Sequence, residues 1–244
     1  MRVTLAIARR ELAGYFSTPL AYVFMVAFVA AAGAVPFYFG GFMERRQADL
    51  TSFFSYHPWL FLILIPAIGM RLWAEERRQG TIELLMTLPV TPWQAVLGKF
   101  LAAWALIGVN LLLTVPIWIT VNYLGSPDNG VIAASYLASF LMGGAMLAVT
   151  SCLSSLTRSQ VIAFVLGIAA IFLLMMSGLD LVLNLFSGWA PPYVTDLVAS
   201  FSFLTHFNAV ARGVLDAPAI VYFLSVILLF LFINRQVVEI WKSP

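Results

Sequence analysis

Residues 70–90 read MRLWAEERRQGTIELLMTLPV and place a dense cluster of charge between two long apolar runs. Six charged side chains fall within it: Arg71, Glu75, Glu76, Arg77, Arg78 and Glu83. Only 10% of the whole chain is charged, so this stretch differs sharply from what precedes and follows it. It indicates a polar connection outside a membrane, with apolar membrane-crossing segments on either side.

The composition of the chain supports the same interpretation. Of the 244 residues 62% are hydrophobic, and the mean hydropathy is +0.96. A soluble domain of this length would leave too much apolar surface in water, so we expect a polytopic membrane protein in contact with lipids. The net charge of +2 and the absence of a continuous basic patch argue against a nucleic-acid partner. A single cysteine, Cys152, excludes an intrachain disulfide framework.

Apolar runs predict an all-α membrane protein with six transmembrane helices, at residues 20–42, 53–70, 100–124, 131–156, 161–179 and 217–233. A helix needs about 20 residues to cross the hydrocarbon. The second and sixth runs are near the lower limit, and Pro66 is expected to kink the second. Arg9 and Arg10 interrupt the short apolar run at the N-terminus, which is atypical of a cleaved signal peptide. Since no internal repeat or linker is visible, we expect one membrane domain over residues 1–244.

The distribution of basic residues predicts the orientation. With both termini in the cytoplasm, ten basic residues lie inside and three outside; the three are Arg45, Arg46 and Arg212. This bias satisfies the positive-inside rule. Six of the eleven acidic residues then lie outside: Glu44, Asp49, Asp128, Asp180, Asp196 and Asp216.

The region between the last two predicted spans, residues 180–216, is expected to be external although it is apolar. Apolar residues recur at steps of three and four along residues 194–214, which is a helical stripe. Gly188, Pro191 and Pro192 separate this stripe from the preceding apolar piece. We therefore expect two short re-entrant helices rather than a seventh and an eighth span. The external helix carries His206, expected to anchor it by hydrogen bonding, and Arg212 with Asp216 as a pair four residues apart.

The N-terminal sequence ARRELAGYF, residues 8–16, predicts an interfacial helix. Apolar side chains lie on one side, and Arg9 and Arg10 lie on another, followed by Glu11. Such a helix is expected to lie along the inner membrane surface.

The charged segment after the second span has two interpretations. Gly80 is expected to break the charged helix, and Thr81 to cap a second helix with Glu83 near its N-terminus. Leu84 and Leu85 are apolar although the segment lies outside the membrane. Either the segment is a docking surface for a soluble partner, or it is a connector that packs under the bundle; the residues alone leave both open.

The stretch IPAIGMRLWAEERRQGTIELLMTLPVTPWQAVLGKF, residues 65–100, resembles the first cytoplasmic loop of permeases of the six-helix, type-two class of ABC exporters. More closely, it resembles the gliding-motility-associated (GldF-like) permease family. ARRELAGYFSTPLAYVFM, SFLTHFNAVARGVLDA and IVYFLSVILLFLF also resemble segments of that family. The similarity runs from one end of the chain to the other, and departures lie mainly within the apolar spans.

The resemblance implies a permease of the bacterial inner membrane. It would pair with two copies of a separate ATP-binding subunit and with a second permease, identical or related. The loop would carry a coupling helix seated on the ATPase and flanked by the interfacial helix. Glu75, Glu76, Arg77 and Arg78 would then anchor the coupling region, Gly80 and Glu83 would shape it, and Thr81, Ile82, Leu84 and Leu85 would form the buried contact. An auxiliary protein with a large extracytoplasmic domain is a further partner that the family suggests.

The chain lacks the phosphate-binding pattern GxxxxGK[ST]. We therefore expect no cofactor on this chain, ATP and Mg²⁺ on the partner ATPase, and no enzymatic activity of the chain alone. An intramembrane enzyme is disfavoured because no GxSxG or HExxH pattern is present. The alternative that stays open is a non-transporting membrane anchor, or mechanical-coupling subunit, of a gliding-type or cell-envelope complex.

Isolated polar and sulfur-bearing residues within or beside the spans are further candidate sites. Asn110 lies deep in a predicted span, where it would line a translocation path or bond across the bundle, with packing favoured. His57, His206 and the adjacent Met175 and Met176 lack the spacing of a metal site, so no metal is expected.

Overall fold

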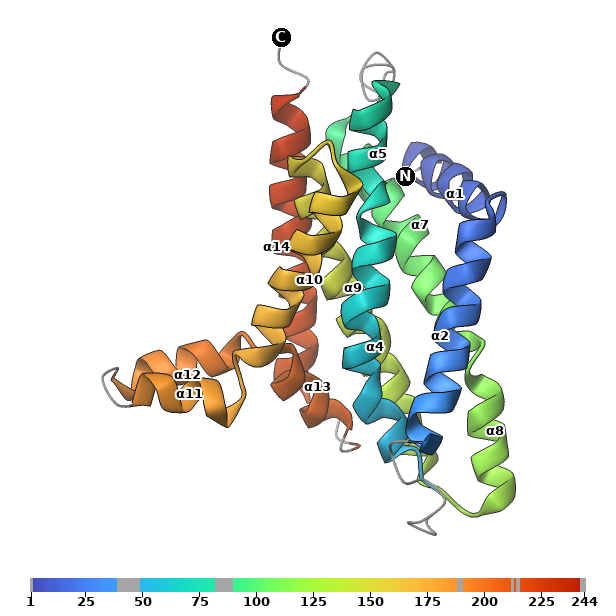
Figure 1. Ribbon diagram of the computed structural model, residues 1–244, viewed down its shortest axis with the longest axis vertical. Helices are drawn as coiled ribbons and strands as arrows, with labels where there is room; N and C mark the ends of the chain where they lie inside the picture. The colour runs from blue at the N-terminus through green and yellow to red at the C-terminus, as the bar shows by residue number, and fades with distance from the viewer. Residues whose placement is uncertain are drawn as a thin grey trace.

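The computed structural model describes residues 2–38, 49–81, 90–187, 191–211, 213 and 216–241, and the described elements are all helices. Helix α9 (Asn129–Leu156) lies at the centre of the bundle and packs against α4, α7, α10 and α14 (Figure 1). These four helices are α4 (Thr51–Gly69), α7 (Pro92–Leu112), α10 (Gln160–Met176) and α14 (Ala217–Ile240), and α2 (Pro19–Tyr38) packs mainly on α4. The all-helical prediction is confirmed for these residues.

Five helical stretches in the described part of the chain are long and apolar enough to cross a membrane. They are Ala21–Tyr38, Thr51–Gln79, Pro92–Leu124, Asn129–Leu156 and Ala217–Ile240. Helix α10 coincides with the predicted fifth span, but its 17 residues extend only about 26 Å at 1.5 Å each. This is slightly less than the roughly 30 Å of a typical hydrocarbon core. A multi-pass membrane protein is therefore supported, while the sixth crossing depends on how α10 sits in the bilayer.

The third predicted span is not one straight helix. Helix α7 begins at Pro92, earlier than expected, because Thr91 and Gln94 form a reciprocal capping box and proline suits the first helical position. It ends at Leu112, and α8 (Val115–Leu124) follows. At the break the Thr114 hydroxyl bonds to Leu111 O at 2.7 Å and to the Tyr136 hydroxyl at 2.9 Å. Pro116 cannot donate a backbone hydrogen bond, which favours the interruption.

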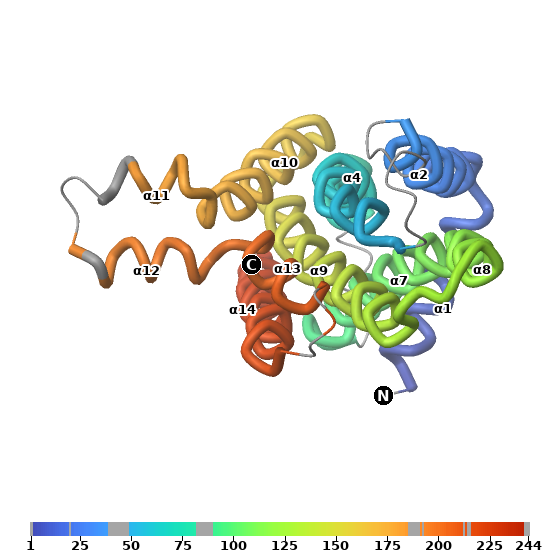
Figure 2. Tube along the Cα trace, turned by 90° about the horizontal axis from the view of Figure 1, so that it is seen from below, coloured from blue at the N-terminus to red at the C-terminus, as the bar shows by residue number. Residues whose placement is uncertain are grey.

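The region between α10 and α14 contains three short helices, where two were expected. They are α11 (Asp180–Ser187), α12 (Pro192–Ser200) and α13 (Phe203–Ala211). Helices α11 and α12 lie side by side and project away from the bundle (Figures 1 and 2). Helix α13 instead packs on α9 and α14, with Phe203 and Phe207 buried. The predicted stripe is thus divided between a projecting helix and a packed one.

Candidate functional site

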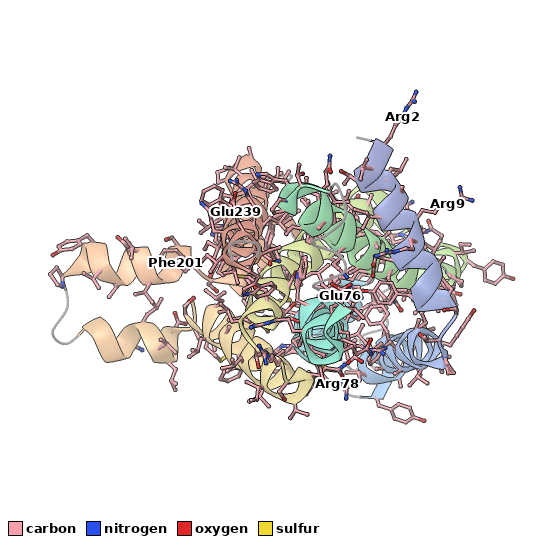
Figure 3. All side chains as sticks on the ribbon, turned by 90° about the horizontal axis from the view of Figure 1, so that it is seen from above. Arg2, Arg9, Glu76, Arg78, Phe201 and Glu239 are labelled. Carbon is pink, nitrogen blue, oxygen red and sulfur yellow. The ribbon has the colours of Figure 1, made fainter. Side chains whose placement is uncertain are left out.

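Most charged side chains of the described chain gather at one end of the bundle, called here the charged end. It is formed by α1 (Arg2–Phe16), α5 (Arg71–Gln79), the start of α7 and the ends of α9 and α14. Both chain ends lie there (Figure 1). Helix α1 lies across this end and not along the bundle (Figures 1 and 3).

Helix α5 continues almost directly from α4. Leu72, Trp73 and Ala74 are buried against the bundle, and the charged residues follow in the next turn. Gly80 ends the helix with a φ of 70°, a left-handed conformation that glycine adopts without steric cost. The predicted break at Gly80 is confirmed.

A buried lysine joins three helices at the charged end. The Lys99 side chain, on α7, is only 3% exposed. Its Nζ lies 2.6 Å from Glu76 Oε1 on α5 and 3.5 Å from Glu11 Oε2 on α1. It also lies 5.3 Å from the ring centre of Trp73, within cation–π range. In Figure 3, Glu76 lies on the side of α5 that faces α1 and α7, and Arg78 lies on the other.

The two carboxylates with shifted pKa values at this end both favour their ionised form. Burial alone would raise the pKa of Glu11, but Lys99 and Arg10 outweigh it and lower that pKa below its ordinary value. The pKa of Glu75 is also lowered, chiefly by the hydrogen bond from Arg78 at 2.7 Å. Glu11 and Glu75 therefore enter their ion pairs as carboxylates at neutral pH.

The C-terminal turns of α9 hold α5 through serine hydroxyls. Ser154 Oγ accepts from Trp73 N at 3.3 Å and Ala74 N at 3.1 Å, and it donates to Met70 O at 2.8 Å. In an uninterrupted helix Ala74 N would donate to Met70 O. A hydroxyl from another helix that bridges these groups marks the junction between α4 and α5.

Further contacts fix the other side of α5. Arg77 donates to Ser155 O at 2.9 Å, and its guanidinium lies 4.3 Å from the ring centre of Trp241. Trp73 Nε1 donates to Ser151 Oγ at 3.3 Å. The same hydroxyl accepts from Asn234 Nδ2 at 2.9 Å, which adds α14 to the network. Helix α5 is therefore attached directly to α9. Ser151 links it to Asn234 of α14, and Arg77 links it to Trp241, the residue that follows α14.

Helix α1 approaches α7 closely at Gly98. A Cβ atom placed there would lie 2.7 Å from Ile7 Cγ2, so only glycine fits without displacement. Ile7 and Ala8 are buried in this contact, while Arg9 and Arg10 are exposed. The predicted two-sided character of the N-terminal helix agrees with this arrangement.

The tip of α5 points away from these contacts. Arg78, Gln79, Gly80 and Thr81 are exposed. Thr81 Oγ1 reaches back to Glu76 O at 3.5 Å. The remaining predicted coupling residues, Ile82, Glu83, Leu84 and Leu85, lie outside the described residues, as does any helix capped by Thr81.

The other predicted residues lie apart from the charged end. Asn110 is fully buried in α7, and its Nδ2 donates to Leu106 O at 2.9 Å. His206 anchors α13 as expected: its Nε2 bonds to Ser200 O at 2.9 Å and its ring stacks on Tyr222 at 3.9 Å. Asp216 precedes α14 without capping it through its side chain. Arg212 lies outside the described residues.

Sequence reasoning did not single out Lys99 or the serines of α9. A lysine at the start of an apolar run is a usable signal, because a charge beside the membrane requires a partner. The pattern SCLSS, residues 151–155, repeats small hydroxyl residues at helical spacing, which favours close interhelical hydrogen bonding. The α5 groups that bond to Ser151 and Ser154 lie about 80 positions away in the sequence. The sequence alone therefore does not show that these serines bind α5.

The sequence matches a known family over most of its length. Residues 23–233 match a family described as "ABC-2 family transporter protein". The chain belongs to the ABC-2 family. ABC-2 permeases are membrane-embedded components of ABC transporters that work with an ATP-binding subunit, and they are not themselves the catalytic part.

Two curated relatives agree with the family. Both are named "Probable multidrug ABC transporter permease YbhR", one from Escherichia coli K12 and one from Escherichia coli O157:H7. Each is 31% identical over 119 residues, which is 49% of this ABC-2 chain. The match spans 29% of the relatives' own length.

Proposed function

We propose that this ABC-2 chain is the permease subunit of an ATP-driven exporter and that its charged end docks on a separate ATP-binding subunit. The observation that carries the proposal is the attachment of α5. Its inner side is held by α1, α7 and α9 through Lys99, Ser154 and Arg77, while its tip is exposed. A force on the tip would therefore reach several bundle helices at once.

The proposal includes an orientation and a span count. The charged end lies in the cytoplasm of a bacterial inner membrane, because ten of the thirteen basic residues then lie inside. Helix α10 forms the sixth span, because it packs along α9 and α4 and local thinning of the bilayer accommodates its short length. Helices α11 and α12 then lie at the outer membrane surface.

The assembly that we propose contains two ATP-binding subunits and two permease chains. ATP and Mg²⁺ bind to the ATP-binding subunits, and closure of these subunits pushes both copies of α5. The resemblance of residues 65–100 and 202–217 to gliding-associated permeases supports placing the chain in that branch, with an auxiliary extracytoplasmic protein. The substrate passes along a path between the two permease chains.

The test compares two pairs of leucines. In the first variant, Leu84→Ser and Leu85→Ser remove apolar side chains next to the α5 tip. In the matched control, Leu181→Ser and Leu197→Ser change two exposed leucines, on α11 and α12. Burial of one leucine contributes about 1.5–3 kcal/mol, so loss of two weakens docking by at least a hundredfold, taking about 1.4 kcal/mol per factor of ten.

The measurements are co-purification with the cognate ATP-binding subunit and ATPase activity of the reconstituted complex. We expect the tip variant to lose both and the control to retain both, with normal membrane insertion in each. Full partner binding and activity in the tip variant would mean that the segment is only a connector. ATP hydrolysis by the complex without any transport would favour the anchor alternative.

A further inference from the structure

A cavity of about 450 Å³ opens at the end of the bundle opposite to α5. It lies among the start of α4, the start of α9 and one side of α13, all at the lower end in Figure 1. Its volume is within the range of small-molecule sites, which is about 300–1,000 Å³. None of the residues of the charged end lines it.

The floor of the cavity is apolar and well packed. Leu50, Phe54, Ile132 and Phe207 line it, and each is 3% exposed or less. Two of these four are phenylalanines, which come from α4 and α13. Two phenylalanine rings in the lining suit an apolar body, and aromatic rings also attract cations.

The rim of the cavity is polar and acidic. Asp49 and Asp128 both line it. Each uses only Oδ1 for backbone hydrogen bonds: Asp49 accepts from Thr51 N at 3.1 Å, and Asp128 accepts from Gly130 N at 2.9 Å. The second oxygen of each carboxylate has no hydrogen bond or ion pair within the described part of the chain. The lining contains no basic side chain among the residues described.

The wall formed by α13 is fixed to the bundle. Ser202, just before α13, donates to Met175 O on α10 at 3.3 Å. His206 stacks on Tyr222 of α14. The cavity is therefore bounded on this side by an attached helix, which favours a preformed site.

The chemistry of the lining selects the ligand. An organic anion would meet two carboxylates, and a hydrated metal ion would meet the apolar floor. A neutral hydrocarbon would leave the carboxylates unused. We propose that this cavity binds an organic cation with an apolar aromatic or aliphatic body. Its use as a substrate site, facing the outside of the cell, rests on the proposed transport function, whereas binding itself does not.

The test uses two ions of the same shape and opposite charge. The full chain in phosphatidylcholine nanodiscs is equilibrated with tetraphenylphosphonium or with tetraphenylborate, and binding to empty nanodiscs is subtracted. The charge variant carries Asp49→Asn and Asp128→Asn, because asparagine retains the oxygen that accepts the backbone hydrogen bonds. The matched control is Asp196→Asn, which removes one exposed acid on α12 outside the cavity lining.

We expect saturable binding of tetraphenylphosphonium, about tenfold tighter than any binding of tetraphenylborate. The charge variant should lose this preference, and Asp196→Asn should retain it. Ala211→Phe, which places a ring in the cavity, should abolish saturable binding; if it fails to fold, the charge variant still decides. Equal affinity for both ions, or an unchanged preference in the charge variant, would overturn the proposal.

The outcome is independent of the test of the proposed function. Binding without ATP-driven movement of tetraphenylphosphonium would retain the site and refute its transport role. Coupled ATPase activity without binding would refute the site and leave the transporter proposal intact.

Discussion

Replacing Lys99 with methionine should loosen the charged end more than any change at its exposed rim. The substitution keeps an apolar stem of similar length but leaves Glu76 and Glu11 without the ammonium group at 2.6 and 3.5 Å. Removal of one partner from a buried pair costs about 3–5 kcal/mol. The two carboxylates are 20% and 21% exposed and regain some hydration, so we expect a loss of about 2–3 kcal/mol.

The assay is thermal unfolding of the purified chain in detergent. For a chain of this size a loss of 2–3 kcal/mol corresponds to a decrease in Tm of roughly 5–10 °C. Arg78→Met removes the exposed ion pair with Glu75 and serves as the matched control, with no measurable decrease expected.

A double variant separates charge from packing. Lys99→Met with Glu76→Met replaces the closest pair by two apolar side chains, which is often neutral or stabilising in a protein interior. The double variant should therefore be more stable than Lys99→Met alone. If Lys99→Met melts at the wild-type temperature, or if the double variant is less stable than the single one, the buried pair does not hold the three helices together.

Two further predictions concern topology and pH. Cysteines placed at Gln79 and Asp196, both exposed, in a Cys152→Ser background should react with impermeant reagents from opposite sides of the membrane; labelling from one side would refute the orientation. Because Lys99 and Arg10 lower the pKa of Glu11 in the folded state, its stabilisation is complete above the ordinary value of 4.5 and is lost as pH falls through the lowered pKa. Between about pH 6 and pH 3 the Tm should therefore fall more steeply for the wild type than for Glu11→Gln, and parallel curves would contradict this.

The sequence predicted the elements better than it predicted their contacts. Hydropathy located the runs that became α2, α4, α9 and α14, because length and apolar composition decide membrane crossing. It missed the break after α7, because Thr114 and Tyr136 come together only when α9 packs beside it. Hydropathy also missed the break between α12 and α13 at Ser202. The hydrogen bond from Ser202 to Met175 O forms there only when α10 packs nearby.

The charged segment shows the same limit at the candidate site. Glu75 and Glu76 are adjacent in sequence and were expected to act alike. Glu75 pairs within α5 with Arg78, whereas Glu76 pairs with the buried Lys99 on α7. A local pattern identifies a charge cluster, but the difference between a rim charge and a buried one depends on a neighbour 23 positions away.

The hydroxyl of Ser154 has a consequence for recombination between related permeases. Because it bridges the backbone of α5 at Met70 and Ala74, the segment that we propose to dock on the partner does not carry all of its own hydrogen-bonding groups. Consider a related permease that has an apolar residue at the position of Ser154 and receives residues 70–90 of this chain. In that chimera the N–H groups of Trp73 and Ala74 and the carbonyl of Met70 would have to find new partners. Exchange of partner specificity therefore requires transfer of two separate pieces of chain, the loop and the last turns of α9. Natural recombination within the family would be expected to carry both or neither.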